Sequence, residues 1–347
     1  MEELATYVAK AKQSLYFSGA VIERDLSGFL KDHGAAATAI GKDLAGKIDG
    51  IALIGSGGSW ATLQTAKYAL DGVLDIPVEC YFSFDLLWRQ PRRIGPNMLY
   101  VFASYSGETD DVVRALRFAK SKGARTLGIV GKAGSTIDRE CDFSIVYGNG
   151  AIFEIPVAAL VLLAQGLQPG SVDELAAALP AVPTALGKVL AGADARAEAD
   201  ARRFLSATSM MVMGAGPHSP LAYKVALTVV MENIRINGTY CDAAEFRHGP
   251  AEAFERLKPD MMFFLGTDQS RETTEMVLGF CEKQGARTLV YDARDYGDVH
   301  PLLAPLVTNS LTQYFTVYSA ILRGITDLDP RVFMGHGVLN AAGASWP

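Results

Sequence analysis

The sequence predicts an α/β fold made of two tandem domains, each a three-layer α/β/α sandwich around a parallel sheet. Two observations predict it: short apolar runs alternate with helix-length segments, and the first half of the chain is echoed in the second. The three matching pairs of segments are offset by 164, 162 and 159 residues, so their order is kept across half of the chain. The pairs are 98–109 with 262–273, 123–127 with 285–289, and 53–57 with 212–216.

Each copy has the order strand, glycine turn, helix, strand, polar loop, helix, strand. The apolar run 99–103 is short enough to be a buried parallel strand, and a helix that opens at 106–109 follows it to Lys122. Thr109 and Asp110 suit the first turn of that helix. The other elements expected in the first copy are a strand at 50–54, a helix from the turn 55–59 to about Leu74, strands at 77–81, 126–130 and 143–146, and an apolar helix at 151–165.

Five parts make up the predicted domain organisation. They are an N-terminal helical segment (1–48), the first domain (49–168), a proline-containing linker with a connecting helix (169–204), the second domain (205–325) and a C-terminal tail (326–347). In the second domain, a long apolar helix follows Gly216, and a helix at 309–322 is the counterpart of 151–165. Ligands of parallel α/β sheets bind outside the carboxyl ends of the strands, where the glycine turns and polar loops lie.

The composition favours a cytoplasmic globular protein. Of 347 residues, 49% are apolar and 20% charged, and the net charge of −6 argues against nucleic acid or an anionic membrane as the main partner. No Cys/His spacing suits a metal, and the four scattered cysteines indicate reduced thiols. The N-terminus lacks the features of a signal peptide, and the longest apolar run, 155–164, is half the length needed to span a bilayer.

A loop rich in hydroxyl groups follows the predicted strand 99–103. Helix N-termini favour anions, and hydroxyls around a glycine add neutral donors, so this loop suits the phosphate of a sugar phosphate. The alternative is a helix cap with no ligand. In the second copy Asp268 and Arg271 align with Ser104 and Gly107, so we expect one half alone to hold phosphate. The hydroxyl residues that flank Gly107 are Ser104, Ser106 and Thr109.

The glycine turn 55–59 is by itself weaker evidence for a ligand-binding site than the hydroxyl loop. It lacks the full Gly-x-Gly-x-x-Gly spacing of a dinucleotide site, and no lysine follows it to make a phosphate-binding P-loop. A dinucleotide site would also need an acidic residue that closes the next strand, for which Glu79 is a candidate. The hydroxyl loop and the duplication favour a sugar phosphate over a nicotinamide cofactor, so no cofactor is predicted.

Two further residues are candidates for acid–base catalysis. Glu232 ends an apolar stretch, where a carboxylate is costly unless it is paired or transfers protons. His248 precedes Gly249 and Pro250, a turn that fixes its direction, and histidine can act as acid or base near neutral pH. Structural roles are the alternatives: Glu232 could pair with a nearby arginine (Arg235 or Arg247), and His248 could bond a carbonyl.

Together these motifs resemble the double-SIS (sugar isomerase) family, which includes the isomerase half of glucosamine-6-phosphate synthase and the fructosamine-6-phosphate deglycases. The resemblance implies that Glu232 is the catalytic carboxylate and that His248, in the pattern Glu-x-x-His-Gly-Pro that begins at Glu245, opens the sugar ring. The stretch 303–307 with Asn309 is closest to the deglycase branch. The resemblance also implies substrate contacts from Ser104, Tyr105, Ser106 and Thr109 at the phosphate and from Gly57, Gly58 and Ser59 at the sugar.

The sequence departs from the family pattern in three places. No amidotransferase domain precedes the repeat, and Met1 is followed by an acidic residue, so an ammonia-supplying cysteine is not expected. His336 stands near the place of a lysine that the family often carries in its tail, and it is expected to serve as a polar contact. The segment 151–154 lacks the hydroxyl-rich pattern of the synthase.

The expected activity is therefore proton transfer between C1 and C2 of an open-chain ketose 6-phosphate, without metal or cofactor. Deglycation of a fructosamine 6-phosphate, which gives glucose 6-phosphate and a free amine, fits best. The alternatives are an aldose–ketose isomerase, a deaminase of an amino-sugar 6-phosphate and a non-catalytic sugar-phosphate regulator. The sequence has no basic helix-turn-helix segment, which disfavours a transcriptional regulator. The resemblance also implies a homodimer with shared active sites.

Overall fold

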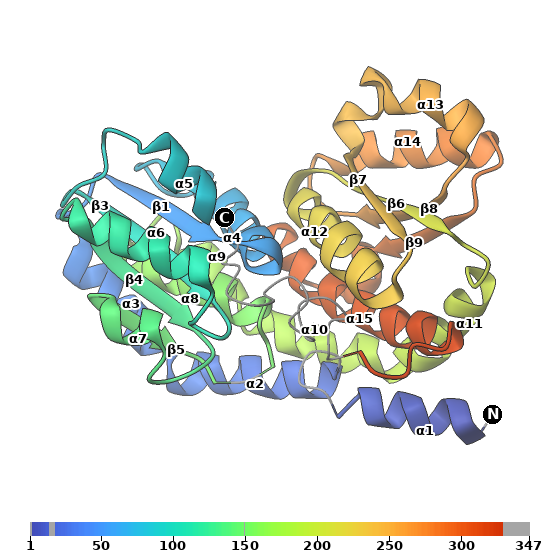
Figure 1. The fold of residues 1–347 in the computed structure, drawn as a ribbon, viewed down its shortest axis with the longest axis horizontal. Helices are drawn as coiled ribbons and strands as arrows, with labels where there is room; N and C mark the ends of the chain where they lie inside the picture. The colour runs from blue at the N-terminus through green and yellow to red at the C-terminus, as the bar shows by residue number, and fades with distance from the viewer. Residues whose placement is uncertain (1, 14–17, 149, 329–347) are drawn as a thin grey trace, which may run out of the picture.

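The computed structural model describes residues 2–13, 18–148 and 150–328, and its core is two parallel β-sheets that lie side by side (Figure 1). The first sheet has the strand order β2-β1-β3-β4-β5 and the second the order β7-β6-β8-β9. Every strand pair is parallel, as predicted. The strands are β1 (Gly50–Gly55), β2 (Val78–Phe82), β3 (Met98–Ser104), β4 (Arg125–Val130), β5 (Phe143–Val146), β6 (Ser209–Gly214), β7 (Asn237–Asp242), β8 (Asp260–Leu265) and β9 (Thr288–Asp292).

The repeat is confirmed by the common strand order, but its alignment at the third strand is corrected. Ile51 pairs with Leu99, and its counterpart Met210 pairs with Asp260, so the offset of this strand is 161 residues rather than 164. The helices that follow begin at Asp110 and Arg271, with the same offset. A buried parallel strand is apolar throughout, so its sequence has no period that fixes the register.

Helices cover both faces of the first sheet. On one face α3 (Gly34–Leu44), α4 (Gly57–Asp71) and α8 (Glu154–Leu167) pack on side chains such as Leu53 and Val101. On the other face α5 (Ser83–Arg89) and α6 (Asp110–Ser121) pack on the alternate side chains, Ile54 and Phe102 among them. This is the three-layer sandwich that the sequence predicts. The short α7 (Thr136–Glu140) completes this half. Of the two N-terminal helices, α1 (Glu2–Ala11) packs on α15 (Ala304–Leu322) of the second half, and α2 (Gly19–Asp32) contacts elements of both halves.

The second sheet is covered in the same way. The predicted long helix after Gly216 is divided into the 3₁₀ turn η2 (Gly216–His218), α12 (Ser219–Lys224) and a π-helix, η3 (Val225–Ile234). These elements and α15 (Ala304–Leu322) cover one face. The 3₁₀ segment η4 (Ala243–His248), α13 (Pro250–Leu257) and α14 (Arg271–Lys283) cover the other. Two short 3₁₀ segments, η5 (Ala293–Tyr296) and η6 (Pro301–Leu303), precede α15.

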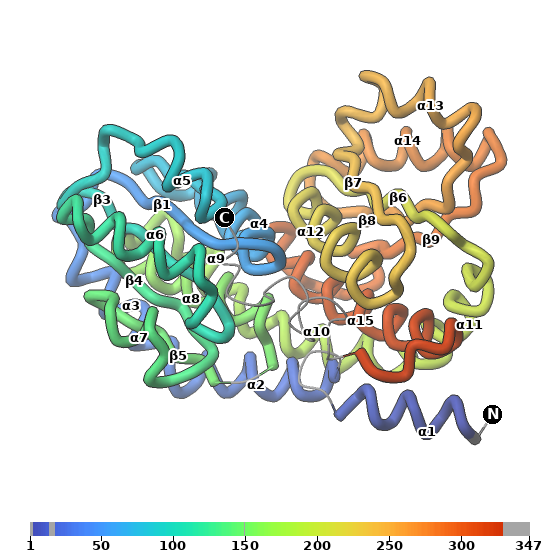
Figure 2. Tube along the Cα trace, in the orientation of Figure 1, coloured from blue at the N-terminus to red at the C-terminus, as the bar shows by residue number. Residues whose placement is uncertain are grey.

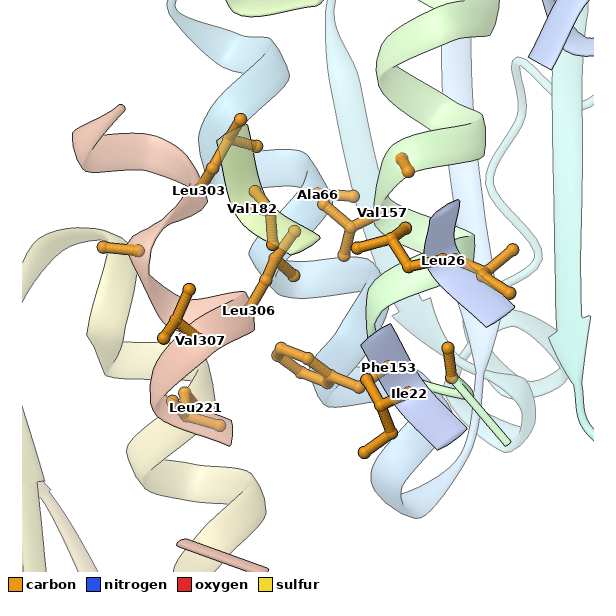
Figure 3. Packing of buried hydrophobic residues seen from close by; sticks show 14 of the residues in the cluster. Ile22, Leu26, Ala66, Phe153, Val157, Val182, Leu221, Leu303, Leu306 and Val307 are labelled. Carbon is orange, nitrogen blue, oxygen red and sulfur yellow. The ribbon is translucent and has the colours of Figure 1, made fainter. Parts of the chain in front are cut away.

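One apolar core joins the two halves. Figure 3 shows Phe153 and Val157 of the first half close to Leu306 and Val307 of α15, and all four are fully buried in one cluster. The segment 173–203 is long and apolar enough to cross a bilayer, but it forms three successive helices (Figure 2). The first packs on α8, the second on α2 and α15, and the third on α15. These helices are α9 (Asp173–Ala178), α10 (Ala181–Val189) and, after the 3₁₀ turn η1 (Leu190–Gly192), α11 (Ala193–Arg203).

Two glycines let α3 and α8 approach closely. A Cβ on Gly41 would lie 1.9 Å from the carbonyl oxygen of Leu163, and a Cβ on Gly166 would lie 2.0 Å from that of Thr38. No side chain fits at either place, because the obstacle is backbone. The two helices therefore touch along their main chains, which fixes α3 of the N-terminal segment on α8 of the first domain.

Candidate functional site

The hydroxyl loop lies at the carboxyl end of β3, where α6 begins. The Ser104 Oγ lies 2.7 Å from the Thr109 Oγ1 and 3.4 Å from the Ser106 Oγ, so the structure brings the three predicted hydroxyls together. The backbone N–H of Gly107 donates to Ser104 (3.1 Å), and that of Glu108 donates to Ser106 (3.2 Å). Side-chain oxygens and amide donors thus converge at the start of a twelve-residue helix, the kind of place where anions bind.

Gly107 and Tyr105 fix the shape of this loop. Gly107 has a φ of +67°, and a Cβ there would lie 2.0 Å from the Ser135 Oγ, so no other residue fits without rearrangement. The carbonyl of Tyr105 accepts the N–H of Gly131 (3.0 Å), which ties the loop to the end of β4. The predicted phosphate contact of Tyr105 is therefore accompanied by a structural role that its sequence position did not reveal.

The glycine turn forms the first turn of α4 at the neighbouring strand end. Gly57 has a φ of +54°, and Gly57, Gly58 and Ser59 open the helix after the N-cap residue Ser56. A Cβ on Gly58 would lie 3.8 Å from the Thr228 Oγ1 of η3, so the turn faces the π-helix of the second domain. The predicted sugar-contacting turn and the segment that carries Glu232 are thus neighbours.

Glu232 lies in the last turn of η3, half-buried, three residues before the left-handed Arg235 (φ 59°) that ends the helix. The apolar pattern 227–231 predicted a helix here but not its π-helical form, which is rare and is often found at functional sites. Thr228, one turn earlier, donates its hydroxyl to the carbonyl of Lys224 (2.8 Å). The carboxylate therefore stands on an irregular helix whose preceding turn contacts the first domain.

Sequence reasoning missed a buried polar cluster behind η3. Lys224 is 8% exposed and Glu154 is 1% exposed, and Asn309 lies between them. The Lys224 Nζ donates to the Asn309 Oδ1 (2.6 Å), and the Asn309 Nδ2 donates to the Glu154 Oε1 (2.8 Å). Burial lowers the pKa of Lys224 to about 8, against the opposing effects of Glu154 and Glu232. A lone lysine in the apolar segment 221–231 was the signal that could have revealed this cluster.

His248 and Glu245 lie elsewhere in the chain, in η4. Both side chains are exposed, and the Arg247 Nε is 3.2 Å from the His248 Nε2. Gly249 follows with a φ of +139°, which agrees with the predicted turn. Figure 1 shows α13, which begins directly after this turn, at the top of the second domain and apart from the first. His336 lies outside the described residues.

The second copy of the loop is occupied by its own side chains. With the corrected alignment, Asp268 corresponds to Gly107 and Leu265 to Ser104. Arg271 is buried; it donates to the carbonyl of Gly266 (2.8 Å) and makes two hydrogen bonds to the carboxylate of Asp292 (2.8 and 2.6 Å). This bidentate pair holds the pKa of Asp292 below its usual range.

A pocket of about 300 Å³ lies between α4 of the first half and the glycine turn at Gly216 of the second half. Two of its lining residues, Asp71 and Asp242, are acidic, and its Lys67 forms an ion pair with Asp71. Its remaining lining residues are Gln64, Tyr68, Gly216, Ser219 and Pro220. Such walls do not suit a phosphate dianion, in contrast to the hydroxyl loop of the first half.

Comparison with known proteins agrees with this architecture. A family model described as "SIS domain" matches residues 47–164. Fructoselysine 6-phosphate deglycase of Escherichia coli (strain K12) is 26% identical over 294 residues, which cover 83% of this chain and 86% of the relative. Fructosamine deglycase FrlB of Bacillus subtilis (strain 168) is 26% identical over 315 residues, which cover 85% and 92%.

A solved structure supports the same fold. The C-terminal domain of glucosamine-fructose-6-phosphate aminotransferase from Francisella tularensis superposes with a TM-score of 0.77 at 20% identity, covering 93% of this chain and 97% of that one. The matched SIS model covers the first domain, and the second domain repeats its strand order. The first domain therefore matches the SIS-domain model, and the chain as a whole is similar to proteins built from two such domains.

Proposed function

We propose that this chain is a deglycase of fructosamine 6-phosphates that releases glucose 6-phosphate and a free amine. The observation that carries the proposal is a hydroxyl-lined helix start at one strand end and, at the neighbouring strand end, a glycine turn that faces the π-helix carrying Glu232. The hydroxyl loop suits phosphate, and the carboxylate suits proton transfer. Similarity to two deglycases over more than four-fifths of the chain favours this substrate class. Proton transfer at carbon needs no metal here, since a positioned carboxylate can act as the base.

The chemistry follows from these roles. The hydroxyl loop anchors the phosphate, and His248 assists opening of the sugar ring. Glu232 takes a proton from C1, which carries the amine, to give an enaminol. It returns the proton to C2, which leaves an imine at C1, and one water hydrolyses this imine to the aldehyde of glucose 6-phosphate and the amine.

The proposal includes a cytoplasmic homodimer with shared active sites. His248 is exposed, and its described hydrogen-bonding neighbour is Arg247 rather than any residue of the first domain. A histidine so placed can complete a site on a second copy of the chain, and two-fold dimers would form two such sites.

The direct test is incubation of the protein with a panel of phosphorylated Amadori compounds, with glucose 6-phosphate measured enzymatically. Unphosphorylated fructosamines serve as the control for the phosphate anchor and should not react. Fructose 6-phosphate and glucosamine 6-phosphate test the isomerase and deaminase alternatives. Turnover of either one, with no product from the Amadori panel, would replace the deglycase assignment. Binding of these compounds without turnover of any of them would indicate a non-catalytic sugar-phosphate regulator instead.

A further inference from the structure

The hydroxyl of Ser56 joins the glycine turn to the helix that follows the hydroxyl loop. Ser56 lies at the N-cap of α4, and its Oγ donates to the carboxylate of Asp111, the second residue of α6. The same Oγ lies 3.2 Å from the Oγ of Ser83, a fully buried residue at the start of α5. This network therefore connects the segments that follow β1, β2 and β3, and both proposed substrate-binding segments are among them.

Ser56 does not cap its own helix. An N-cap hydroxyl ordinarily accepts a hydrogen bond from the second or third N–H of its helix, as that of Ser18 does at α2. The backbone of Ser56 is extended (φ −137°, ψ 152°), as this bond requires, yet the side chain makes no capping hydrogen bond within the described residues. Its single proton goes to Asp111 instead. The N–H groups left uncapped are those of Gly58 and Ser59.

These N–H groups lie in an open part of the turn. Among the described residues outside its own turn, a Cβ on Gly57 would meet no atom within 4 Å, and one on Gly58 would meet only the Thr228 Oγ1. A ligand can therefore approach the donors closely. Thr109, at the N-cap of α6, is arranged in the same way, because its Oγ1 bonds to the Ser104 Oγ (2.7 Å) rather than to its own helix. Both helix starts thus present N–H donors that their N-cap hydroxyls do not occupy.

We propose that Asp111 is a positioning residue of the substrate site: it draws the hydroxyl of Ser56 away from α4 and so keeps the first N–H groups of this helix open to the substrate. The inference rests on the proposed function, in which the glycine turn contacts the sugar and the hydroxyl loop holds the phosphate. The alternative is that Asp111, like its neighbour Asp110, only complements the positive end of the α6 dipole.

The sign of the change in substrate affinity separates the two roles. Asp111→Ala removes a negative charge from the start of the helix that faces the phosphate, so a purely electrostatic role predicts tighter binding. If Asp111 is a positioning residue, the released hydroxyl of Ser56 caps α4, and Kd should rise about three- to tenfold, as expected for one neutral hydrogen bond. Isothermal titration with a fructosamine 6-phosphate measures Kd. Tighter or unchanged binding would overturn the proposal.

Asp110→Ala is the matched control. Asp110 is exposed in the same helical turn, and its carboxylate lies 3.9 Å from Arg114 of its own helix. Its removal should not weaken binding, because it leaves the hydrogen bond between Ser56 and Asp111 in place. In Asp111→Ala the rise should appear in KM, with kcat within about twofold of wild type, because the carboxylate of Glu232 is untouched. A loss confined to kcat would contradict the positioning of substrate donors.

A second substitution tests whether Ser56 transmits the effect. Asp111→Ala/Ser56→Ala removes the hydroxyl that would cap α4, so Kd should return to within about twofold of wild type. Asp111→Asn keeps an oxygen that can accept the Ser56 hydroxyl, and it should bind no more than about twofold more weakly than wild type. A double variant as weak as Asp111→Ala would show that the loss does not pass through Ser56 and would refute the inference. An Asp111→Asn protein as weak as Asp111→Ala would refute it equally.

Amide hydrogen exchange tests the inference without substrate. In Asp111→Ala the amides of Gly58 and Ser59 should exchange more slowly than in wild type, because the Ser56 hydroxyl now accepts one of their protons. Addition of Ser56→Ala should restore the wild-type rates. Equal rates in wild type and Asp111→Ala would overturn the proposal. If exchange slows as expected but no phosphosugar binds to the wild-type protein, the proposed function alone is refuted.

Discussion

Ser104, Ser106 and Thr109 form one hydrogen-bonded group at the start of α6, where we propose that the phosphate binds. Replacement of Ser106 by Ala or of Thr109 by Val removes one donor. Because a hydrogen bond to a charged group contributes about 1.5–3 kcal/mol, substrate affinity should fall roughly 10- to 150-fold. Isothermal titration with a fructosamine 6-phosphate measures it. Ser270→Ala, at the N-cap of α14 in the other half, is the control and should leave affinity unchanged. Comparable losses from both loops would contradict a single phosphate site.

Glu232 is expected to transfer the proton itself. Glu232→Gln keeps the shape of the side chain and removes the base, so turnover should fall roughly 10²–10⁴-fold. The affinity for substrate should stay near that of wild type. Loss of exchange between the C1 proton and deuterated solvent, followed by NMR, identifies the step. Glu252→Gln, an exposed glutamate on α13, is the matched control. Exchange at the normal rate in the Glu232→Gln protein would assign the base to another residue.

At the scale of single residues, the sequence predicted clusters of neighbouring residues but not contacts between residues that are distant in the chain. Three hydroxyls around a glycine were enough to predict a clustered loop, because all lie within six residues at one strand end. The cluster of Lys224, Asn309 and Glu154 could not be predicted, since Asn309 and Glu154 are separated by 155 positions in the chain. Which distant polar residues meet in a core depends on how the domains pack, and local pattern does not encode that.

Among the elements, the contact between α3 and α8 gives the sharpest prediction for stability. A Cβ on Gly166 would lie 2.0 Å from a backbone oxygen, so Gly166→Ala must push the helices apart. We expect the free energy of unfolding to fall by about 1–3 kcal/mol or more. Chemical denaturation followed by circular dichroism measures this loss. Gly72→Ala is the control: its φ is −86° and no atom lies within 4 Å of the new Cβ. Equal losses in the two variants would refute the close-packing explanation.

Many predicted elements lie close to their observed positions, but η3 differs in form, and α15 begins at Ala304 rather than at the predicted residue 309. The apolar run 227–231 predicts a buried helix, but α- and π-helices bury the same kind of residues, and the choice between them depends on tertiary packing. The strand β7 was also absent from the expected elements, because its burial alternates and its sequence is polar. Edge strands of this kind carry little of the apolar signal that predicted β3 and β8.

For the whole molecule, shared active sites in a homodimer predict complementation. Ser106→Ala and His248→Ala proteins should each be nearly inactive alone. After mixing and subunit exchange, half of the dimers pair the two variants, and one of their two sites has a sound loop and a sound histidine. About a quarter of the wild-type activity should return. A mixture of Ser106→Ala with Ser106→Ala/His248→Ala protein is the control and should stay inactive. No recovery after verified exchange, or a monomer by light scattering, would contradict the arrangement.

The common core in Figure 3 also determines how substrate can enter. Enzymes of two domains often admit ligand by swinging the domains apart about a hinge. Here Phe153, Val157, Leu306 and Val307 are fully buried in a cluster that spans both halves, so such a swing would expose apolar surface that ordinarily stays dry. A shared core of this kind makes separation of the two halves costly. We therefore expect entry and product release to depend on smaller movements at the strand ends.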